Sequence, residues 1–389
     1  MSLEWVEIGE LQAKKNGPID PSKFLDETFE LHSIPSHDKG NAEILTGREI
    51  GSSKQIVQEN DVMISKIVPH IRRAMVVPKK GNFRQIASSE WIVFRSERIY
   101  PNYLKHLLIS DFFNAQFMAT VSGVGGSLLR ARPTFVSKIK IPLPPLTEQK
   151  RIAQILDKAD ELRQKRQQSI DKLNELLQAC FLKIFENEKC SMSQIKDLLE
   201  NGKSIRTGPF GSQLLHSEFV DEGIAVLGID NAVKNTFKWA KPRFITPEKY
   251  EQLKRYTVKP KDVIITIMGT CGKCAVVPDK IPLSINTKHL CCITLDFDKC
   301  NPEFLHSYFL LHPTSINFLK SRAKGAIMAG LNMSIIKDLP VELPSIEIQN
   351  EFAELKTKIG LQKSKLINQL QEQDNLFQSL QQRAFNGEL

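Results

Sequence analysis

The chain has 389 residues, of which 41% are hydrophobic, and it carries a formal net charge of +9 and seven cysteines. This length allows two or three domains with packed cores. The sequence has no run of about 18 apolar residues, so we expect no membrane span. Its N-terminus lacks a basic stretch followed by an apolar stretch, so we expect no signal peptide. An odd number of scattered cysteines favours a reducing compartment over a disulfide framework, and we therefore expect a cytoplasmic protein.

The first globular segment, residues 1–146, alternates short apolar runs with turns. Runs rich in β-branched and aromatic residues are typical of strands. Such runs occupy residues 29–34, 61–66, 74–77 and 91–94. A helix is expected over residues 101–118, because it opens with a proline, which is favoured in a first helical turn. A glycine-rich turn at residues 123–126 follows, with Arg130 and Arg132 close behind it.

A long helix is predicted next, over residues 147–186. The segment follows the proline-rich stop at residues 142–145, and neither Gly nor Pro occurs between Thr147 and Asn201. Thr147 is expected to cap the helix, because a threonine hydroxyl at that position accepts a backbone hydrogen bond. A helix of this length spans roughly 60 Å, which is too long for the core of a compact domain and suits a strut.

The second half of the chain repeats the first. Residues 187–346 form a second globular segment in which Asp262-Val263-Ile264-Ile265 matches Asp61-Val62-Met63-Ile64. Residues 347–389 form a second long helix, in which Gly360 is the only Gly or Pro between Ser345 and Asn386. The early parts of the two globular segments do not align, so we expect one scaffold with different surfaces.

The two long helices match without a gap after a shift of 200 residues. Gln149 falls on Gln349, and each helix carries an apolar stripe at 3/4 spacing, which is typical of a coiled-coil-like seam. The stripe positions are 152, 155, 159, 162, 173, 176 and 180, and then 352, 355, 359, 366, 376 and 380. Polar residues interrupt the seam at Arg166 and Gln369. The simplest prediction is that the helices pack on each other in antiparallel fashion; an ordinary helical hairpin is the alternative.

The positive charge belongs to the globular segments and not to the helices. The segment 1–146 has 19 Lys and Arg against 15 Asp and Glu, and the segment 187–346 has 21 against 16. The helices have 8 against 7 and 5 against 6, so they are nearly neutral. Two matched basic segments favour a polyanionic partner such as nucleic acid.

Motifs for catalysis or cofactor binding are incomplete. The run Gly269-Thr270-Cys271-Gly272-Lys273-Cys274 lacks the first glycine and the final Ser or Thr of a phosphate-binding loop. Cys271 and Cys274 with the adjacent pair Cys291-Cys292 lack a second C-x-x-C, so we interpret them as buried thiols and not as a zinc site. Residues 123–126 are a turn and not a dinucleotide fingerprint. We expect no cofactor and no bound metal, and find no nucleophile–base pair or methyltransferase signature.

Basic and hydrogen-bonding loops are the remaining candidates. Lys and Arg neutralise phosphates, and Ser, Thr, Asn and backbone N–H groups fix the position of a protein on DNA. The candidates in the first segment are Ser53, Lys54, Lys66, Arg72, Arg73, Lys80, Arg84, Arg130 and Arg132. Those in the second segment are Lys203, Arg206, Thr207, Gly208, Phe210, Ser212, Asn231, Lys234, Lys273 and Lys288. We expect alanine at Arg72 or Arg73 to weaken DNA binding; for each single residue an ordinary solvated charge is the alternative interpretation.

The order of lobe, helix, lobe, helix resembles the specificity subunit of type I restriction–modification systems. The resemblance is carried by Leu143-Pro144-Pro145-Leu146-x-Glu148-Gln149-x-x-Ile152-Ala153 and by Leu343-Pro344 with Gln349. The turn Thr207-Gly208-Pro209-Phe210-Gly211-Ser212 is similar to that family's target-recognition domains. In the first segment Gly51-Ser52-Ser53-Lys54 with Ser89-Glu90-Trp91 is also similar, but the Gly-Pro-Phe-Gly-Ser turn is absent.

The resemblance implies an α+β fold with two similar target-recognition lobes, 1–146 and 187–346, separated by two long antiparallel helices, 147–186 and 347–389, in a pseudo-twofold internal repeat. It implies a non-catalytic subunit whose lobes each read one half of a bipartite double-stranded DNA target while the helices set the spacer. Successive major-groove faces lie roughly 34 Å apart, which such a helix can span. Two methyltransferase subunits and an endonuclease/translocase subunit would be the protein partners.

Two other functions stay open from the sequence. The first is a stand-alone DNA methyltransferase or nuclease with cryptic active residues, and the second is an assembly scaffold whose lobes bind protein. Methyl transfer by the purified chain alone distinguishes the first, and sequence-specific footprinting distinguishes the second.

Overall fold

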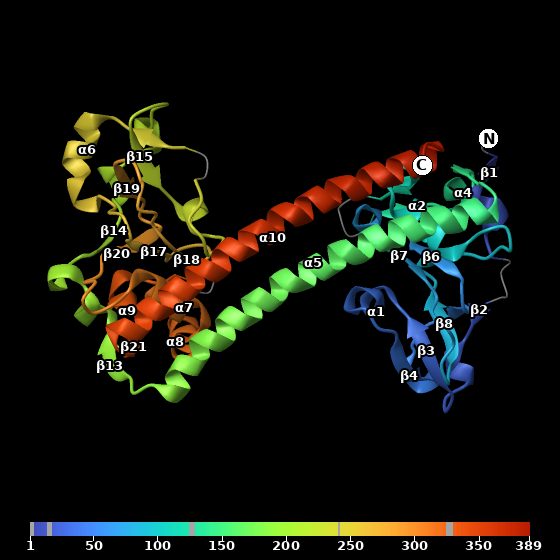
Figure 1. Ribbon diagram of the computed structural model, residues 1–389, viewed down its shortest axis with the longest axis horizontal. Coiled ribbons are helices and arrows are strands. Elements are labelled where there is room, and N and C mark those ends of the chain that lie inside the picture. Colours follow the sequence, from blue (N-terminus) through green and yellow to red (C-terminus); the bar gives the residue numbers. More distant parts are fainter. Residues whose placement is uncertain (1–3, 14–17, 124–128, 240–241, 324–329) are drawn as a thin grey trace. The chain divides into compact units, whose positions relative to one another are not determined.

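The computed structural model describes residues 4–13, 18–123, 129–239, 242–323 and 330–389 (Figure 1). Contacts divide the chain into two compact units: unit 1 is Met1–Gln168 with Ile367–Leu389, and unit 2 is Ser169–Leu366. Each unit therefore contains one globular lobe and one half of each long helix. We call the residues before 146 lobe 1 and residues 188–345 lobe 2. Residues 124–126 of the glycine-rich turn lie outside the described residues, and the four-part domain division at 146, 186 and 346 stays a prediction.

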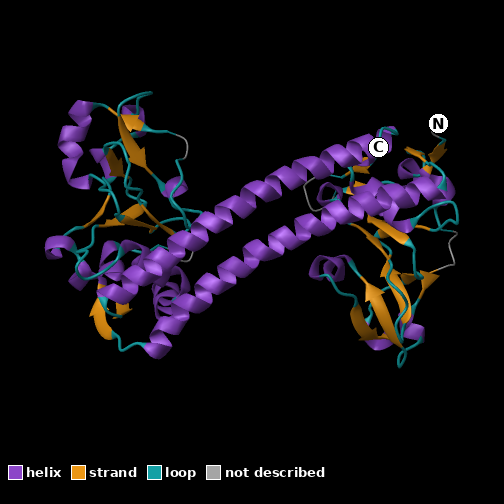
Figure 2. Ribbon diagram, in the orientation of Figure 1, coloured by secondary structure: helices purple, strands orange, loops and turns teal. Residues whose placement is uncertain are grey.

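Lobe 1 holds a five-stranded sheet in the order β2-β5-β8-β3-β4, a three-stranded sheet in the order β7-β6-β9, and two strand pairs (Figure 2). Its strands are β1 Trp5–Glu7, β2 Pro18–Ile19, β3 Thr28–His32, β4 Glu43–Thr46, β5 Lys54–Ile56, β6 Val62–Ser65, β7 Ala74–Val76, β8 Arg84–Ser88, β9 Trp91–Phe94, β10 Val121–Ser122, β11 Arg130–Ala131 and β12 Lys140–Pro142. β3 runs parallel to β8 with Leu31 opposite Ile86, and the other neighbours are antiparallel. The four predicted strands are confirmed as β3, β6, β7 and β9.

The helix expected over residues 101–118 is two helices, α2 Pro101–Ile109 and α3 Asp111–Ala119. Ser110 between them has extended backbone, and its hydroxyl accepts a hydrogen bond from the N–H of Phe113 at 3.3 Å. The expectation of one helix was wrong. A serine within an apolar helical pattern can lie on the surface of a continuous helix or cap a new one, and the sequence does not distinguish the two. The short helices α1 Ile34–Lys39 and α4 Pro133–Val136 complete the lobe.

Lobe 2 holds a four-stranded sheet in the order β14-β20-β17-β18, a three-stranded sheet in the order β16-β15-β19, and the pair β13-β21. Its strands are β13 Ser191–Gln194, β14 Ile205–Thr207, β15 Ile224–Leu227, β16 Phe244–Ile245, β17 Val263–Thr266, β18 Cys274–Val276, β19 Ser284–Asn286, β20 Leu290–Ile293 and β21 Pro340–Leu343. Its helices are α6 Pro247–Leu253, α7 Pro302–Leu311, α8 Pro313–Arg322 and α9 Met333–Lys337.

The two lobes share a central strand arrangement, to which lobe 1 adds β2 and β5 and lobe 2 adds β14. The parallel pair β3 and β8 of lobe 1 corresponds to the parallel pair β15 and β19 of lobe 2. The central strand β6 lies between β7 and β9, as β17 lies between β18 and β20. The predicted α+β fold with an internal repeat is confirmed. Buried cores in each lobe contain central-strand residues such as Val62 and Val263, which are fully buried.

The long helices are α5 Leu146–Asn187 and α10 Ile346–Asn386, with 42 and 41 residues. At 1.5 Å per residue α5 is about 63 Å long. α5 begins one residue before Thr147, so Thr147 lies in the first turn and its expected role as the cap is wrong.

Gln149 and Gln349 explain the repeated motif at the two helix entrances. Gln149 is 1% exposed; its Oε1 accepts from the N–H of Tyr100 at 2.7 Å, and its Nε2 donates to the carbonyls of Arg98 and Pro144. Gln349 is fully buried and makes the same three bonds, to Asn301, Lys299 and Pro344. Each glutamine thus ties the helix start to the segment that enters α2 or α7, and a buried amide of this kind needs all its partners.

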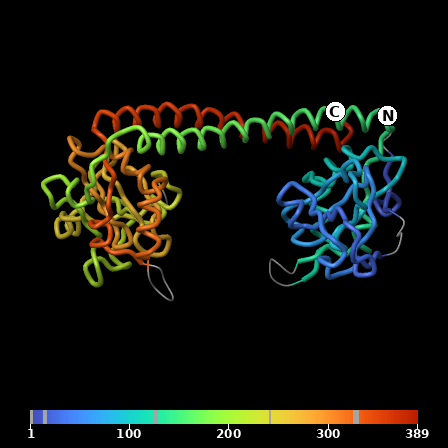
Figure 3. The backbone as a smooth tube through the Cα atoms, turned by 90° about the horizontal axis from the view of Figure 1, so that it is seen from below, coloured from blue at the N-terminus to red at the C-terminus, as the bar shows by residue number. Residues whose placement is uncertain are grey.

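Within each unit the segments of α5 and α10 lie side by side and run in opposite directions (Figure 3). In unit 1 Arg163 donates to Asp374 at 2.6 Å and Arg166 donates to Gln369 at 2.7 Å. In unit 2 Lys363 donates to Asn174 at 2.7 Å. The predicted antiparallel pairing is therefore confirmed within each unit, with polar contacts between the helices.

The apolar stripe is buried only in part. Ile152, Phe352 and Ile359 are buried, whereas Leu162 and Leu176 are 46% and 48% exposed. Leu376 is also exposed, so these three leucines of the predicted stripe lie outside the buried part of the seam. Most of the burial occurs where a helix meets its lobe, because two helices alone cover only one face of each other. The helix residues buried in the lobe cores include Leu156, Phe181, Phe377 and Phe385.

Candidate nucleic-acid interface

Lobe 2 has one end at which several strands finish and from which its loops project. Leu227 at the end of β15 lies beside Asn286 at the end of β19. Thr266 at the end of β17 lies opposite Leu290, where β20 begins, and Thr207 at the end of β14 lies opposite the next residue of β20. We call this the loop end of lobe 2. The loops there are residues 208–213, 228–239, 267–273 and 287–289.

The loop end brings together most candidates of the second segment: Thr207, Gly208, Phe210, Ser212, Asn231, Lys234, Lys273 and Lys288. Gly208 is required for close packing, since a Cβ atom there would lie 2.0 Å from the carbonyl oxygen of Asn286. Asn231 is buried; its Oδ1 accepts from the N–H of Gly228 and its Nδ2 donates to the carbonyl of Lys238. These two residues therefore shape the loops from inside.

Exposed cations and apolar side chains share this loop end. Lys234, Lys273 and Lys288 are exposed, and none forms an ion pair with another described residue. Phe210 is 49% exposed and Trp239 is 54% exposed. Cations without carboxylate partners attract phosphates, and exposed aromatic rings offer contacts to bases.

His289 reports on the charge around these loops. Burial, followed by the nearby charges of Lys288 and Arg243, lowers the pKa of His289. The guanidinium of Arg243 pairs with Asp230. Burial is the main reason that His289 favours its neutral form, and Lys288 and Arg243 act in the same direction.

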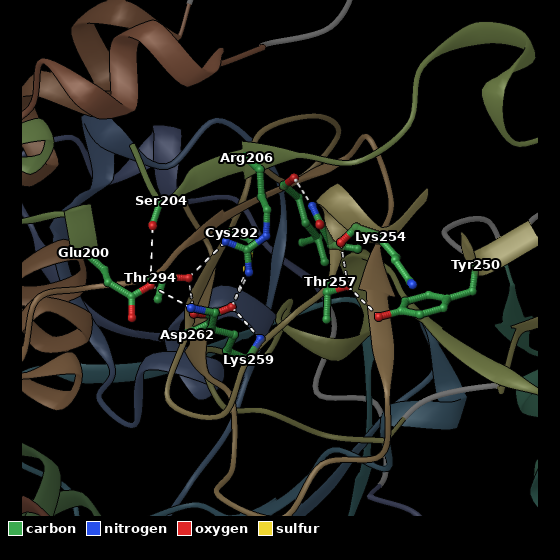
Figure 4. A network of polar contacts seen from close by, with 12 residues as sticks. Glu200, Ser204, Arg206, Tyr250, Lys254, Thr257, Lys259, Asp262, Cys292 and Thr294 are labelled. Carbon is green, nitrogen blue, oxygen red and sulfur yellow. Dashed lines mark hydrogen bonds and ion pairs between the residues drawn. The ribbon is translucent and has the colours of Figure 1, made fainter. Parts of the chain in front are cut away.

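Arg206 is held inside lobe 2 and does not point from the loop end (Figure 4). Its guanidinium donates to Asp262 Oδ2 at 2.6 Å and to Thr294 Oγ1 at 2.9 Å. The Asp262 side chain is fully buried and also accepts from Thr294 at 2.5 Å and from the N–H of Lys259 at 2.7 Å. Lobe 1 has the same buried carboxylate at Asp61, paired at 2.6 Å with Arg95. Arg206 thus neutralises a buried carboxylate at the start of the central strand.

Lobe 1 has an equivalent loop end. His32 at the end of β3 lies beside Ala87 near the end of β8, and Ser65 at the end of β6 lies opposite Trp91, where β9 begins. Six candidates lie at this end: Ser53, Lys54, Lys66, Arg72, Arg73 and Arg130.

Most cations at the loop end of lobe 1 are paired within the lobe. Arg73 makes two bonds to Asp38 of α1, at 2.6 and 2.7 Å, and its guanidinium lowers the pKa of that carboxyl. Arg72 pairs with Asp111 of α3 at 2.5 Å. Lys66 and Arg130 both approach Glu90, at 3.9 and 3.3 Å. These pairs hold the loops in place and reduce the net charge that they present.

Lys54 is different, because it is 9% exposed and has no carboxylate partner among the described residues. Its ammonium donates to the carbonyl and hydroxyl oxygens of Ser52, at 2.8 and 2.6 Å. Burial lowers the pKa of Lys54. A buried lysine normally has an anionic partner, so this ammonium is suited to an anion supplied by a ligand. Its neighbour Ser53 is exposed.

Four candidates lie away from the loop ends. Lys80 is exposed in the loop that leads to β8, and Arg84 pairs with Glu27 at 2.9 Å, both at the opposite end of the lobe 1 sheets. Arg132 donates to the carbonyl of Thr120 and lies over the ring of Phe135, whose centroid is 4.0 Å away. Lys203 is exposed at the opposite end of lobe 2, just before β14.

Two loop-end residues, Met268 and Trp239, were missed from the sequence. Met268 is 38% exposed and stands out only once the loops are placed in space, whereas Trp239 had a usable signal, since it lies in a lysine-rich run. His70, which is exposed, and Ile71, which is 50% exposed, belong to the basic run His70-Ile71-Arg72-Arg73 that the sequence also indicated.

The cysteine pattern is explained by burial. Cys274, Cys291 and Cys292 are fully buried, as predicted, whereas Cys271 is half-buried. Burial raises the pKa of Cys274 and of Cys291 to about 12, which keeps both as thiols, a poor form for metal ligation or nucleophilic attack. Among the described residues no group of three or more His, Cys, Asp or Glu is arranged to hold a metal ion. None of the described helices is long and apolar enough to cross a membrane.

Comparison with known proteins gives matches along the chain. The family model of the type I restriction modification DNA specificity domain matches twice, at residues 3–175 and 187–373. The MjaVIII specificity subunit of Methanocaldococcus jannaschii is 25% identical over 56% of this chain and 54% of its own length. The EcoBI specificity subunit of Escherichia coli is 26% identical over 64% of this chain and 58% of its own length. The alignments thus span little more than half of these two relatives.

Solved structures show the same fold. A chain from work on complex assembly and conformational transition of the type I R-M system matches with a TM-score of 0.62 and 19% identity, over 100% of this chain and 98% of that chain. The type I restriction–modification S subunit from M. genitalium matches with a TM-score of 0.57 and 13% identity, over 99% of this chain and 96% of that chain.

Proposed function

Because the chain belongs to the family of the type I restriction modification DNA specificity domain, we propose that it is a specificity subunit that reads a bipartite double-stranded DNA target. In this proposal lobe 1 and lobe 2 are the two target-recognition domains, and each reads one half of the target through its loop end.

The observation that carries the proposal is that two lobes with the same central strand arrangement present different loop ends. The parallel pair β3 and β8 and the parallel pair β15 and β19 position the loops alike, but the loop residues differ. A shared scaffold gives both lobes the same approach to the duplex, and unlike side chains give unlike half-sites. An asymmetric target in two parts follows from this arrangement.

The roles of the candidates follow from their exposure. Lys273 and Lys288 of lobe 2, which form no ion pair with another described residue, and Lys54 of lobe 1 bind phosphates and set the position on the duplex. Lys234 and Ser212 belong to the same loop end as Lys273 and Lys288 and contribute to the phosphate contacts of lobe 2. Arg72, Arg73 and Arg206 act through the shape of the lobes, because their guanidinium groups are paired with Asp111, Asp38 and Asp262.

We propose that α5 and α10 set the number of unread base pairs and bind the catalytic partners. Exposed leucines on the helices, such as Leu162 and Leu176, give a methyltransferase subunit an apolar surface beside neutral polar residues. Two methyltransferase subunits would transfer the methyl groups and an endonuclease/translocase subunit would cleave, so the chain itself is non-catalytic and acts in the cytoplasm.

The test is to co-express the chain with type I methyltransferase subunits and to map methylated adenines in the cells. A motif in two parts with an unread spacer supports the proposal, and it should change in one half only when the loop end of one lobe is exchanged. A continuous motif, or methyl transfer by the purified chain alone, contradicts it.

A further inference from the structure

The loop between β6 and β7 in lobe 1 and the loop between β17 and β18 in lobe 2 are held by the same frame. We call residues 66–73 tip loop 1 and residues 267–273 tip loop 2. The N–H of Lys66 donates to the carbonyl of Glu90, and the N–H of Ile267 donates to the carbonyl of His289. The carbonyls of the same two residues accept from the N–H groups of Ala131 and Leu331. Both loops therefore leave the sheet from one position and in one direction.

Each tip loop needs left-handed backbone at two positions. In tip loop 2 these are Gly269 and Gly272, with φ of 76° and 82°. In tip loop 1 they are Val68 and Arg72, with φ of 47° and 53°. Glycine adopts this conformation without steric cost, whereas a β-branched valine with positive φ is a marked outlier. Left-handed backbone is thus unstrained in tip loop 2 and strained in tip loop 1, which is one residue longer.

Surrounding contacts hold tip loop 1 in its strained form. Arg72 pairs with Asp111 of α3, and Arg73 pairs with Asp38 of α1, so the C-terminal arm of the loop is fixed to two helices; in the N-terminal arm the N–H of Val68 donates to the carbonyl of Leu129. The N–H of Ile71 donates to the carbonyl of Val68 at 3.1 Å and closes a tight turn. Between these fixed points the side chains of His70 and Ile71 are exposed. A strained turn that exposes an apolar side chain costs folding free energy. Such strain is typical of sites where the position of a side chain serves a function.

We propose that the tip loops are the specificity-determining elements of the two lobes, with His70 and Ile71 contacting base edges in lobe 1 and Met268 and Thr270 doing so in lobe 2. Val68, Arg72 and Arg73 are positioning residues that fix the tip. The proposal rests on the function proposed above and adds to it the residues that read the bases.

The chemistry of the tips fits the major groove. The methyl groups of Ile71 suit the C5-methyl group of thymine, and an imidazole donates to or accepts from base edges. Tip loop 2 offers a thioether and a hydroxyl from the equivalent anchor point, which suits different base edges. Unlike tips on one frame give the two half-sites unlike sequences, with no change in how each lobe meets the phosphates.

The experiment selects double-stranded DNA from a randomised pool with the full chain, and compares wild type with four variants. Ile71→Ala removes the apolar tip, and Met268→Ala is the matched change in lobe 2. The double variant Val68→Gly with Arg72→Gly gives tip loop 1 the glycines of tip loop 2. Val68→Asn removes the valine side chain but suits the left-handed backbone. Thermal melting checks the fold of each, and shifts of no more than about 3 °C are expected.

The expected result is that Ile71→Ala lowers the preference at one or two base pairs of one half-site by about tenfold and leaves the other half unchanged. Met268→Ala should do the same in the other half only. The double glycine variant should weaken the half-site affected by Ile71→Ala, and Val68→Asn should keep the wild-type motif. The salt dependence of binding should stay the same for Ile71→Ala, because no charge is removed.

Two outcomes overturn the inference. If the wild-type chain selects a motif in two parts and Ile71→Ala with the double glycine variant leaves both halves unchanged, the tip loops do not read bases. If both lobes' variants alter both halves alike, the loops act through general stability. A wild-type chain that selects no motif contradicts the proposed function itself, and the inference fails with it.

Discussion

The replacement Arg206→Ala separates the sequence-based role of Arg206 from the role that its surroundings indicate. The sequence suggested a DNA contact, but the guanidinium is bound to the fully buried carboxylate of Asp262 and only 15% of the Arg206 side chain is exposed. Removing the arginine leaves the Asp262 charge buried with the hydroxyl of Thr294 and the N–H of Lys259 as its main partners.

The size of the effect follows from the cost of an uncompensated buried charge. Removing one partner of a buried ion pair costs about 3–5 kcal/mol, and the remaining donors to Asp262 place this case near about 3 kcal/mol. For a unit of this size a loss of that amount lowers the melting temperature by about 9 °C. The double variant Arg206→Ala with Asp262→Ala should lose less than the sum of the single changes, because no unpaired charge is left.

Urea denaturation measures the free energy of unfolding, and titration with target DNA at several salt concentrations measures the number of phosphate contacts. Lys203→Ala is the matched control, since Lys203 is exposed and has no ion pair among the described residues; its stability should change by less than about 0.5 kcal/mol. If Arg206→Ala melts within about 2 °C of the wild type and the salt dependence falls by about one phosphate contact, Arg206 binds DNA and the reasoning is refuted.

Three further predictions follow from buried groups. Gln149→Ala and Gln349→Ala should each lower the free energy of unfolding by about 2–3 kcal/mol in urea titrations. Each change leaves a backbone N–H unpaired, that of Tyr100 or that of Asn301. A loss of stability in only one variant would contradict the conclusion that the two glutamines have equivalent roles. Burial, and then Lys356, lowers the pKa of His306 to about 4. The unfolded chain therefore binds more protons, so stability should fall as pH decreases from about 6.5 towards 4, and the slope should be shallower in His306→Gln when both are followed by thermal melting. With a thiol reagent near pH 8, at most three of the seven cysteines of the native protein should react rapidly: Cys180, Cys190 and Cys271. The other four are buried. Rapid reaction of all seven would show that the core of lobe 2 opens readily.

Much of the fold was predictable because its signals are local. Apolar runs identified β3, β6, β7 and β9, and the absence of Gly and Pro identified α5. The break at Ser110 between α2 and α3 was not predictable, because a serine that caps a helix and a serine on a helix surface look alike without their neighbours. The exposure of Leu162, Leu176 and Leu376 depended on which helix faces meet a lobe, and periodicity alone does not determine that.

By itself the sequence determined the repeat: two copies of one lobe-and-helix module, whose long helices match after a shift of 200 residues, with basic lobes and neutral helices. Only the tertiary structure decided which basic residues are available to a partner. Arg73 finds Asp38 35 positions away and Arg206 finds Asp262 56 positions away, while Lys273 and Lys288 find no carboxylate among the described residues. Ion pairs form between side chains that folding brings together. Their separation along the chain does not predict which of them will pair.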